Sequence, residues 1–427
     1  MKNLISDIKS RMILDSRGNP TVEAEVILNG GIKGLASVPS GASTGTLEAH
    51  ELRDGGSKYQ GKGVEKALSN IETYIKPELI GEDCSKQDLI DTKLIDLDGT
   101  ENKKKLGANS MLAVSLANMR AHSSLIGKDL FELIPAVYGE PKLPLPLMNI
   151  LNGGAHADNN IDIQEFMIVP HGFSRYSDCM RAGVEIYHVL KGELKKDMMS
   201  TNVGDEGGFA PNLESSQVAL DIIIDAISKA GYTPGQEVSL ALDVASSEFY
   251  KDGKYIVEGN ELNSEEMSSF LSDLVDKYPI VSIEDGMAES DWEGWRNLTE
   301  GLGSKVQLVG DDLFVTNENI LAKGIEKKCA NSILIKLNQV GTFTETVNTL
   351  KLAKENGYTS VISHRSGETE DSFISHLAIG VGCGQIKTGA PARTERTSKF
   401  NEILRLSEKL GDEVFDNESW KIKYGKA

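Results

Sequence analysis

Six strand-like segments in the C-terminal half of the chain each end in a charged or metal-binding side chain. This pattern constrains the fold more than any other feature of the sequence. The side chains at the segment ends are Asp243, Glu284, Asp311, Lys336, His364 with Arg365, and Lys387. Counted from Asp243, successive positions are 41, 27, 25, 28 and 23 residues apart. Because a strand, a loop and a covering helix together take roughly 30 residues, the spacing predicts one βα unit per step.

These side chains are expected to meet in one pocket, because a parallel barrel carries its chemistry at the carboxyl ends of its strands. Three carboxylates offer the hard oxygen ligands that Mg²⁺ prefers. Two lysines and an arginine would attract an anionic substrate. The pattern as a whole indicates metal-assisted proton chemistry. Taken singly, each residue has an ordinary structural explanation, since a strand-end aspartate often caps a helix.

Lys336 lies within the apolar segment SILIKLNQ. Burial and nearby divalent cations would both lower the pKa of this lysine toward that of a useful base. The alternatives are a lysine paired with an acid for structure, or an edge-strand lysine that faces water. The segment alone does not choose among them.

The composition narrows the possible partners. The chain has 427 residues and 39% hydrophobic content, which is more than one ordinary core needs. A formal net charge of −19 opposes binding to nucleic acid and to anionic membranes. The N-terminus lacks the apolar region of a secretory signal, and no apolar run is long enough to span a membrane. Together with four widely spaced cysteines that form no CxxC pair, this predicts a cytoplasmic protein with reduced thiols.

The chain divides into two predicted domains. Residues 21–38 have the alternation and the Asn-Gly-Gly turn of a hairpin, followed by helical periodicity at 64–80, 87–96 and 109–126. Four of the twelve prolines fall within 135–146, so we place the boundary between Pro135 and Pro144 and predict domains at 1–138 and 139–427. Strands and helices alternate beyond it, with helices expected at 216–230, 317–327, 344–356 and 397–409. The irregular stretches 37–57, 152–162 and 246–263 are candidate lids.

Further polar motifs lie outside the six segments. Glu206 stands between glycines in GDEGGFAPN, where a partly buried acid could act as a general acid. His156, Gln164 and Glu165 belong to a polar loop and the strand after it. His156 alone is more often a structural hydrogen-bonding group than a catalyst. Arg365 with Ser366 could bind phosphate or form an ordinary polar turn, and Lys387 would add a second cation. SGASTG lacks the ending of a P-loop and suits a turn or a mobile lid.

Together and in this order, the motifs resemble the enolase family, bacterial type, nearly end to end. The resemblance includes DSRGNPTVE at 15–23, SGASTG at 40–45, NGGAHADNNIDIQEFM at 152–167, GDEGGFAPN at 204–212, SHRSGETED and IKTGAPARTER. It implies an α/β fold in which an N-terminal α+β domain caps a modified TIM-like β/α barrel. The barrel is expected to open with ββαα, so that one strand pair is not parallel. The spacing leaves the long first gap unexplained beyond an inserted loop at 246–263.

The resemblance also implies an activity, the reversible dehydration of 2-phosphoglycerate to phosphoenolpyruvate in glycolysis with two Mg²⁺ per active site. Asp243, Glu284 and Asp311 match the ligands of the first ion, and Ser43 matches a lid ligand of the second, which arrives with substrate. Lys336 matches the base at C2, and Glu206 the general acid with Glu165 beside it. His156 is a further catalytic candidate. The matching substrate contacts are Gln164, His364, Arg365, Ser366 and Lys387.

Two other classes of function compete with this hypothesis. A related acid-sugar dehydratase or racemase would share the three metal acids, but would not be expected to keep both SHRSGETED and GDEGGFAPN. A binding protein on the same fold would be favoured by loss of Lys336, Glu206 or a metal acid, and all are present. The family further implies a homodimer or ring of dimers, with Arg17 and Glu23 as plausible interface groups. A cell-surface or secreted fraction without a signal peptide is also implied, although KIKYGKA ends in alanine rather than lysine.

Overall fold

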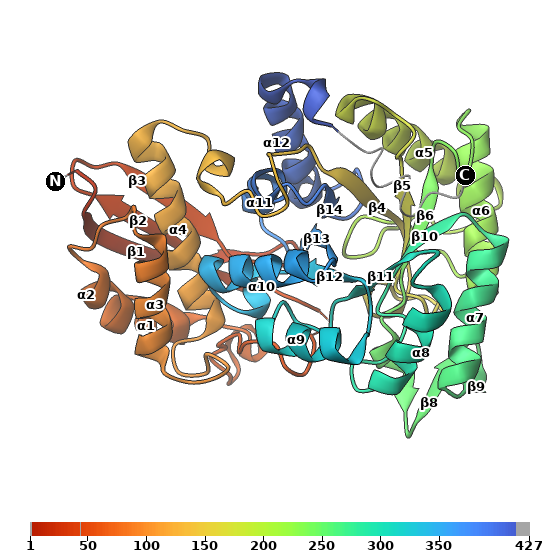
Figure 1. Ribbon diagram of the computed structural model, residues 1–427, viewed down its shortest axis with the longest axis horizontal. Coiled ribbons are helices and arrows are strands. Elements are labelled where there is room, and N and C mark those ends of the chain that lie inside the picture. Colours follow the sequence, from red (N-terminus) through yellow and green to blue (C-terminus); the bar gives the residue numbers. More distant parts are fainter. Residues whose placement is uncertain (1, 43, 416–427) are drawn as a thin grey trace.

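A computed structural model describes residues 2–42 and 44–415 of the chain (Figure 1). The predicted lid ligand Ser43 and the C-terminal KIKYGKA segment lie outside these residues. A small N-terminal sheet with its helices stands at one end of the molecule, and a closed barrel forms the rest (Figure 1). No helix among the described residues is long and apolar enough to cross a membrane. The four cysteines are all described, and all are free thiols.

The N-terminal sheet has three antiparallel strands in the order β1 (Ile5–Leu14), β2 (Pro20–Leu28) and β3 (Lys33–Ser37). The predicted hairpin is therefore confirmed. Strand β1 was not predicted, because Ile5 and Ile8 are its buried positions and a register shift follows Ile5, so no alternation marks the strand. The predicted helices are confirmed as a run of α1 (Glu65–Asn70), a π-helical turn (Ile71–Ile75) and α2 (Lys76–Leu79), then α3 (Gln87–Asp98) and α4 (Ala108–Ile126).

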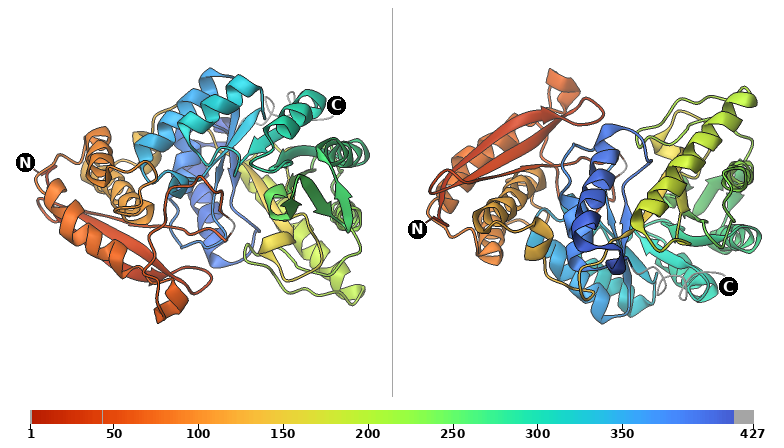
Figure 2. Two further views of the ribbon diagram at one scale, coloured as in Figure 1. Left: turned by 90° about the horizontal axis from the view of Figure 1, so that it is seen from below. Right: turned by 90° about the horizontal axis from the view of Figure 1, so that it is seen from above.

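Helix α4 packs directly on β3 because Gly34 has no side chain. A Cβ at Gly34 would lie 2.2 Å from the carbonyl oxygen of Ala117 and 2.1 Å from the backbone nitrogen of Ala121. Nearly all of α4 is buried between the sheet and the barrel. The helix therefore lies between the N-terminal sheet and the barrel (Figure 2).

The barrel closes in the order β4–β5–β6–β10–β11–β12–β13–β14, and β14 pairs with β4. Its strands are β4 (Leu145–Asn152), β5 (Glu165–Val169), β6 (Ser239–Asp243), β10 (Ile280–Glu284), β11 (Gln307–Gly310), β12 (Ser332–Ile335), β13 (Thr359–Ser363) and β14 (Gln385–Lys387). Strand β5 runs against both neighbours. The expectation of one non-parallel pair was therefore wrong, because a single reversed strand inside a closed barrel makes two.

Helices cover the outside of the barrel. After β5 come α5 (Tyr176–Lys196) and α6 (Ser216–Lys229), which completes the expected ββαα opening. The later helices are α7 (Ser264–Lys277), α8 (Trp292–Leu302), α9 (Glu318–Lys327), α10 (Phe343–Glu355), α11 (Phe373–Val381) and α12 (Thr394–Leu410). The four predicted crossover helices correspond to α6, α9, α10 and α12 and are confirmed.

The stretch 246–263 was predicted to be irregular, and this prediction was wrong. It forms a second small antiparallel sheet of β7 (Tyr250–Lys251), β8 (Lys254–Val257) and β9 (Asn260–Leu262). Asp252 and Gly253 adopt φ of 51° and 79°, as the tight turn between β7 and β8 requires. This Asp-Gly signal was present in the sequence. The sheet fills much of the long 41-residue gap.

The two parts of the molecule are joined by a bidentate ion pair. Arg120 on α4 donates to both carboxylate oxygens of Asp371, at 2.9 and 2.7 Å, and Asp371 lies just before α11 of the barrel. Asp371 also accepts hydrogen bonds from the backbone nitrogens of Ser37, at 3.0 Å, and Phe373, at 2.8 Å. One carboxylate therefore ties β3, α4 and α11 together.

Candidate active site

The six polar positions fall where the spacing predicts, at the carboxyl ends of barrel strands. Asp243, Glu284 and Lys387 are the last residues of β6, β10 and β14. Asp311, Lys336 and His364 directly follow β11, β12 and β13. Neighbouring strands therefore deliver these side chains to one end of the barrel.

Glu165 reaches the same end by a different route. Because β5 is reversed, its first residue lies at the end where the other strands finish. Glu165 is that residue and pairs in register with Asp243, and Gln164 directly precedes it. The amide of Gln164 donates to Asp243 across 3.4 Å.

Lys387 lies among three carboxylates. Its Nζ is 2.8 Å from Glu284 Oε1, 2.9 Å from Asp243 Oδ2 and 3.1 Å from Glu165 Oε1. Burial opposes the charge of this lysine, but the surrounding carboxylates outweigh burial and raise the pKa of Lys387 well above its ordinary value. Lys387 is therefore a fixed cation of the site.

Lys336 forms a close ion pair with Asp311. Burial is the largest single influence and lowers the pKa of Lys336 as predicted, but the carboxylates around it, Asp311 first and Glu284 next, together outweigh burial, and the net shift is upward. The expected lowering is therefore not found in this arrangement, where Asp311 is the dominant neighbour. Asp311 also accepts a 2.9 Å hydrogen bond from the side-chain amide of Gln339, a residue that the sequence analysis missed.

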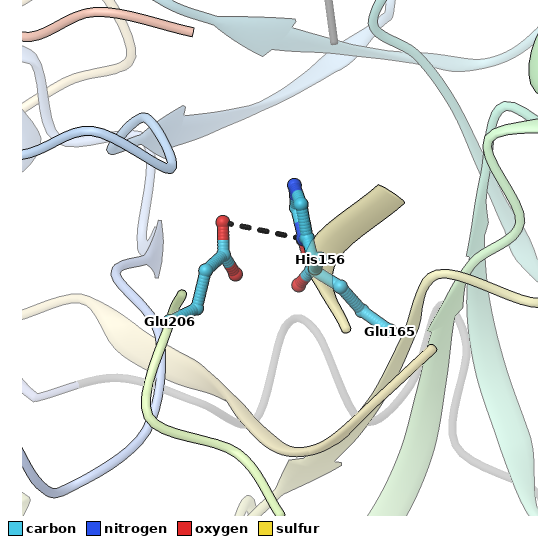
Figure 3. A group of neighbouring side chains, drawn as sticks. All are labelled: His156, Glu165 and Glu206. Carbon is cyan, nitrogen blue, oxygen red and sulfur yellow. Dashed lines mark ion pairs between the residues drawn. The ribbon is translucent and has the colours of Figure 1, made fainter. Parts of the chain in front are cut away.

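Glu165, Glu206 and His156 form a second cluster (Figure 3). The Nδ1 atom of His156 lies 3.5 Å from Glu165 Oε1 and 3.6 Å from Glu206 Oε1. Burial raises the pKa of Glu165 well above its ordinary value, and the charge of Glu206 adds to this effect. Burial opposes the charge of Glu206 as well, but the neighbouring His364, His156 and Arg396 side chains outweigh burial and hold the pKa of Glu206 well below its ordinary value. The pKa values of the two adjacent carboxyl groups are therefore shifted in opposite directions.

The guanidinium of Arg365 is paired with a lid residue that sequence reasoning did not identify. Its Nη1 lies 2.9 Å from Oε2 of Glu48, and its Nη2 lies 3.1 Å from Oε1. Glu48 belongs to the predicted lid 37–57, and it also accepts a 3.3 Å hydrogen bond from Gln339. The neighbouring Ser366 hydroxyl accepts a 2.7 Å hydrogen bond from the backbone nitrogen of Ala42 in the same lid. The lid thus contacts the end of the site that carries Arg365 and Ser366.

One buried cavity joins the two clusters with Arg365. It is lined by residues of seven separate chain segments: His156, Gln164, Glu165, Glu206, Asp243, Lys336, Ser363, His364, Arg365, Ser366 and Lys387. Glu284 and Asp311 contact the lysines of this lining. All of the predicted site residues that the structure describes are therefore brought together.

The site has the donor set of a hard divalent cation. Asp243, Glu284 and Asp311 are buried and offer oxygen atoms alone, as Mg²⁺ prefers. Their nearest cations are the ammonium groups of Lys387 and Lys336, so the same oxygens already bind positive charge. Among the described residues, a second acidic group brings Asp285, Asp311 and Asp312 within 4.8 Å of one another. There Asp285 accepts hydrogen bonds from the backbone nitrogens of Asp311 and Asp312, at 2.9 and 2.8 Å, and so orients the Asp311 loop.

Comparison with known families covers nearly all of the chain. The family model described as the enolase N-terminal domain matches residues 5–134. The model described as the enolase C-terminal TIM barrel domain matches residues 140–423. The fold class predicted from the motifs, with an N-terminal α+β domain and a modified barrel, is confirmed by these matches and by the strand order.

Proposed function

Because the chain belongs to the enolase family, we propose that it is a glycolytic enolase, which dehydrates 2-phosphoglycerate reversibly to phosphoenolpyruvate. The observation that carries the proposal is the make-up of one buried cavity. It combines a lysine, two adjacent carboxyl groups, and an arginine beside a serine hydroxyl. These groups suit a base, an acid and a phosphate site for elimination across a carbon–carbon bond.

The proposed first step is removal of the C2 proton by Lys336. That proton is weakly acidic, because its removal adds charge next to a carboxylate. Two Mg²⁺ ions, held by Asp243, Glu284 and Asp311 and by Ser43 with substrate, would supply the charge that stabilises the carbanion. Since Asp311 raises the pKa of Lys336, positive charge at Asp311 would favour the neutral amine that the base requires.

The proposed second step is loss of the C3 hydroxyl. Hydroxide is a poor leaving group, so it needs a proton, and Glu206 with Glu165 beside it are the buried carboxyl groups that would supply one. His156 contacts both carboxyl groups and would hold them in place. Glu206 would donate the proton to the leaving hydroxyl group. In the reverse reaction the proton would return to Glu206, and Glu165 would stabilise that return.

The remaining residues would orient the substrate. Arg365 and Ser366 would bind the phosphate, since a guanidinium matches its geometry. Lys387 would contact the substrate carboxylate. Gln164 and His364 would complete the wall of the cavity, and the lid carrying Ser43 and Glu48 would exclude water.

The test is ultraviolet detection of phosphoenolpyruvate formed from 2-phosphoglycerate, with Mg²⁺ and with chelator. The variant Lys336→Ala should lose activity, and the exposed Lys305→Ala should keep it. Activity that needs the metal and Lys336 would support the proposal. Inactivity of the folded, metal-supplied wild type would reject it and redirect work to other carboxylate substrates.

The same resemblance supports a cytoplasmic homodimer or ring of dimers. Arg17 and Glu23, the interface groups suggested by resemblance, both have partners within the chain. Arg17 donates to the carbonyls of Ser40 and Gly41, and Glu23 accepts from Arg11 at 2.6 Å and Ser37 at 2.8 Å. Light scattering tests the assembly, and a monomer at working concentration would exclude the dimer.

A further inference from the structure

Arg396 is a fully buried cation at the start of a helix. It is the third residue of α12, and its relative exposure is 0%. The positive end of a helix dipole and the loss of hydration both oppose a cation there, so the position needs strong acceptors. The nearest carboxylate oxygen, on Glu395, lies 3.5 Å from Nε without forming a hydrogen bond.

The acceptors of Arg396 belong to the candidate active site. Nη1 lies 2.6 Å from Nδ1 of His364 and 2.6 Å from the carbonyl oxygen of Arg365. Nη2 donates to the carbonyl oxygens of Ser366, at 2.5 Å, and Asp205, at 3.0 Å. One side chain thus holds the loop after β13 and the glycine-rich loop that carries Glu206.

The backbone packs closely against this contact at Gly389. Gly389 has φ of 79°, and a Cβ there would lie 2.8 Å from the Glu206 carbonyl, 2.9 Å from Arg396 Cδ and 3.1 Å from His364 Cε1. The backbone nitrogen of Ala390 also donates to the Glu206 carbonyl across 3.0 Å. Glu206, His364 and Arg396 therefore meet around a glycine.

The contact with Arg396 decides which ring nitrogen of His364 carries the proton. A guanidinium has donors and no acceptor, so Nδ1 of His364 must accept and cannot carry a hydrogen. A neutral His364 then carries its proton on Nε2, which lies 3.3 Å from Oε1 of Glu206. Burial, with Arg396 acting in the same direction, lowers the pKa of His364 to about 3, which keeps the ring neutral.

We propose that Arg396 is a positioning residue that fixes His364 as the Nε2-protonated tautomer facing Glu206. Glu206 thereby faces the N–H of a neutral imidazole rather than an imidazolium. Arg396 also sets the spacing between the loop with Glu206 and the loop with Arg365 and Ser366. The catalytic consequence rests on the proposed function, whereas the tautomer does not.

The experiment is nitrogen-15 NMR of the full-length protein labelled in its seven histidines, because protonated and unprotonated ring nitrogens resonate far apart. The His364→Asn variant assigns the signal. Wild type should show a protonated Nε2, an unprotonated Nδ1 and no titration between pH 5 and 9. A wild-type His364 with its proton on Nδ1, or one that titrates in this range, would overturn the proposal without reference to activity.

Two variants extend the test. Arg396→Met should release the tautomer and allow His364 to titrate, and it should lower kcat by about 100-fold. Arg396→Lys keeps the positive charge but loses the paired donors of the guanidinium. It should therefore fold even if Arg396→Met does not, and it should keep only part of the preference for the Nε2-protonated tautomer. An unchanged His364 spectrum in either folded variant would contradict the proposal.

Lys399 provides a matched control. It is equally buried, one turn further along α12, and donates to Glu368 at 2.9 Å and to the carbonyls of Thr369 and Glu395 at 2.5 and 2.7 Å. Lys399→Met should lower stability and leave the His364 tautomer unchanged. A tautomer change in Lys399→Met as large as in Arg396→Met would reduce Arg396 to a general packing role and overturn the proposal.

Discussion

Glu206, with Glu165 beside it, is proposed to supply the acid of the reaction, whereas Lys336 is proposed to be its base. Since Lys336 needs no help from the acid to take the C2 proton, the two steps should separate by mutation. Glu206→Gln should lower dehydration by about 10²–10⁴-fold, while exchange of the C2 hydrogen with deuterated solvent continues.

Mass spectrometry of recovered 2-phosphoglycerate measures that exchange, and Lys336→Ala serves as the control that should lose both reactions. Wild-type dehydration by Glu206→Gln would remove Glu206 from the acid role. Loss of exchange together with dehydration would instead indicate that Glu206 is needed to build the site.

Glu402 gives a pH-dependent contribution to stability far from the proposed chemistry. Its hydrogen bonds with His376 and Arg405 lower the pKa of Glu402 to about 2. A carboxyl with a lowered folded-state pKa stabilises the fold above its unfolded pKa of about 4.5 and loses this effect as the pH falls toward 2. Glu402→Gln should therefore lower the free energy of unfolding by about 1 kcal/mol at pH 7.

Urea unfolding at pH 7 and at stepwise lower pH measures the difference, which should shrink between pH 4.5 and 2. Glu408→Gln, an exposed change on the same helix, is the control. A difference that stays constant down to pH 2 would show that the charge of Glu402 is not what stabilises the fold.

At the scale of single residues, the sequence predicted the polar side chains at the ends of strands but not the residues that hold those side chains in place. Asp243, Lys336 and Lys387 could be found because a polar residue interrupts an apolar run. Glu48 and Gln339 could not, because Glu48 contacts Arg365 across 317 positions and no local pattern marks such a pair. Arg396 left a weak signal, a cation in the first turn of a helix, where the dipole disfavours it.

The lid is the element on which phosphate recognition is expected to depend. Glu48 holds both terminal nitrogens of Arg365, yet Glu48 does not line the cavity among the described residues, so phosphate need not displace it. Glu48→Gln should raise KM for 2-phosphoglycerate about tenfold with a smaller change in kcat, since loss of a charged hydrogen bond costs roughly 1.5 kcal/mol or more.

Steady-state kinetics and competitive inhibition by inorganic phosphate measure this effect. Glu51→Gln is the matched control in the same loop, where the carboxylate pairs with Arg53 at 2.7 Å instead. A lower KM in Glu48→Gln would mean that the lid carboxylate competes with phosphate rather than orienting its arginine.

Helices and strands could be predicted where hydrophobic residues recur periodically along them. Helices α6, α9, α10 and α12 fall within three residues of their expected bounds. Strand β1 has few buried positions, and β7 to β9 are each four residues or fewer, so neither gives a long period. The direction of β5 could not be derived from its residues, because alternation and burial are the same for a strand in either direction.

For the whole molecule, the pair between Arg120 and Asp371 is one of the contacts that join the N-terminal domain to the barrel. A double-mutant cycle of Arg120→Met and Asp371→Asn should give a coupling energy of about 1–2 kcal/mol in chemical unfolding. The reason is that the Asp371 side chain is 7% exposed and bonded to three elements.

The control cycle uses Arg175 and Asp412, an ion pair with a 2.9 Å contact whose side chains are 58% and 47% exposed. That pair should show no resolvable coupling, because solvent screens it. Equal coupling in both cycles would mean that burial adds nothing to the link between the domains.

The site cannot be complete until β14, which closes the barrel by pairing with β4, has been synthesised. Lys387 pairs with both Asp243 and Glu284, but it is synthesised 144 residues after Asp243. At about 5–20 residues per second, the ribosome needs roughly 7–30 s to cover that distance. During this interval the chain carries Asp243 and Glu284 without the lysine that pairs with them, and the strand that closes the ring brings that lysine. Closure of the barrel and arrival of this counter-charge are therefore one event, late in synthesis.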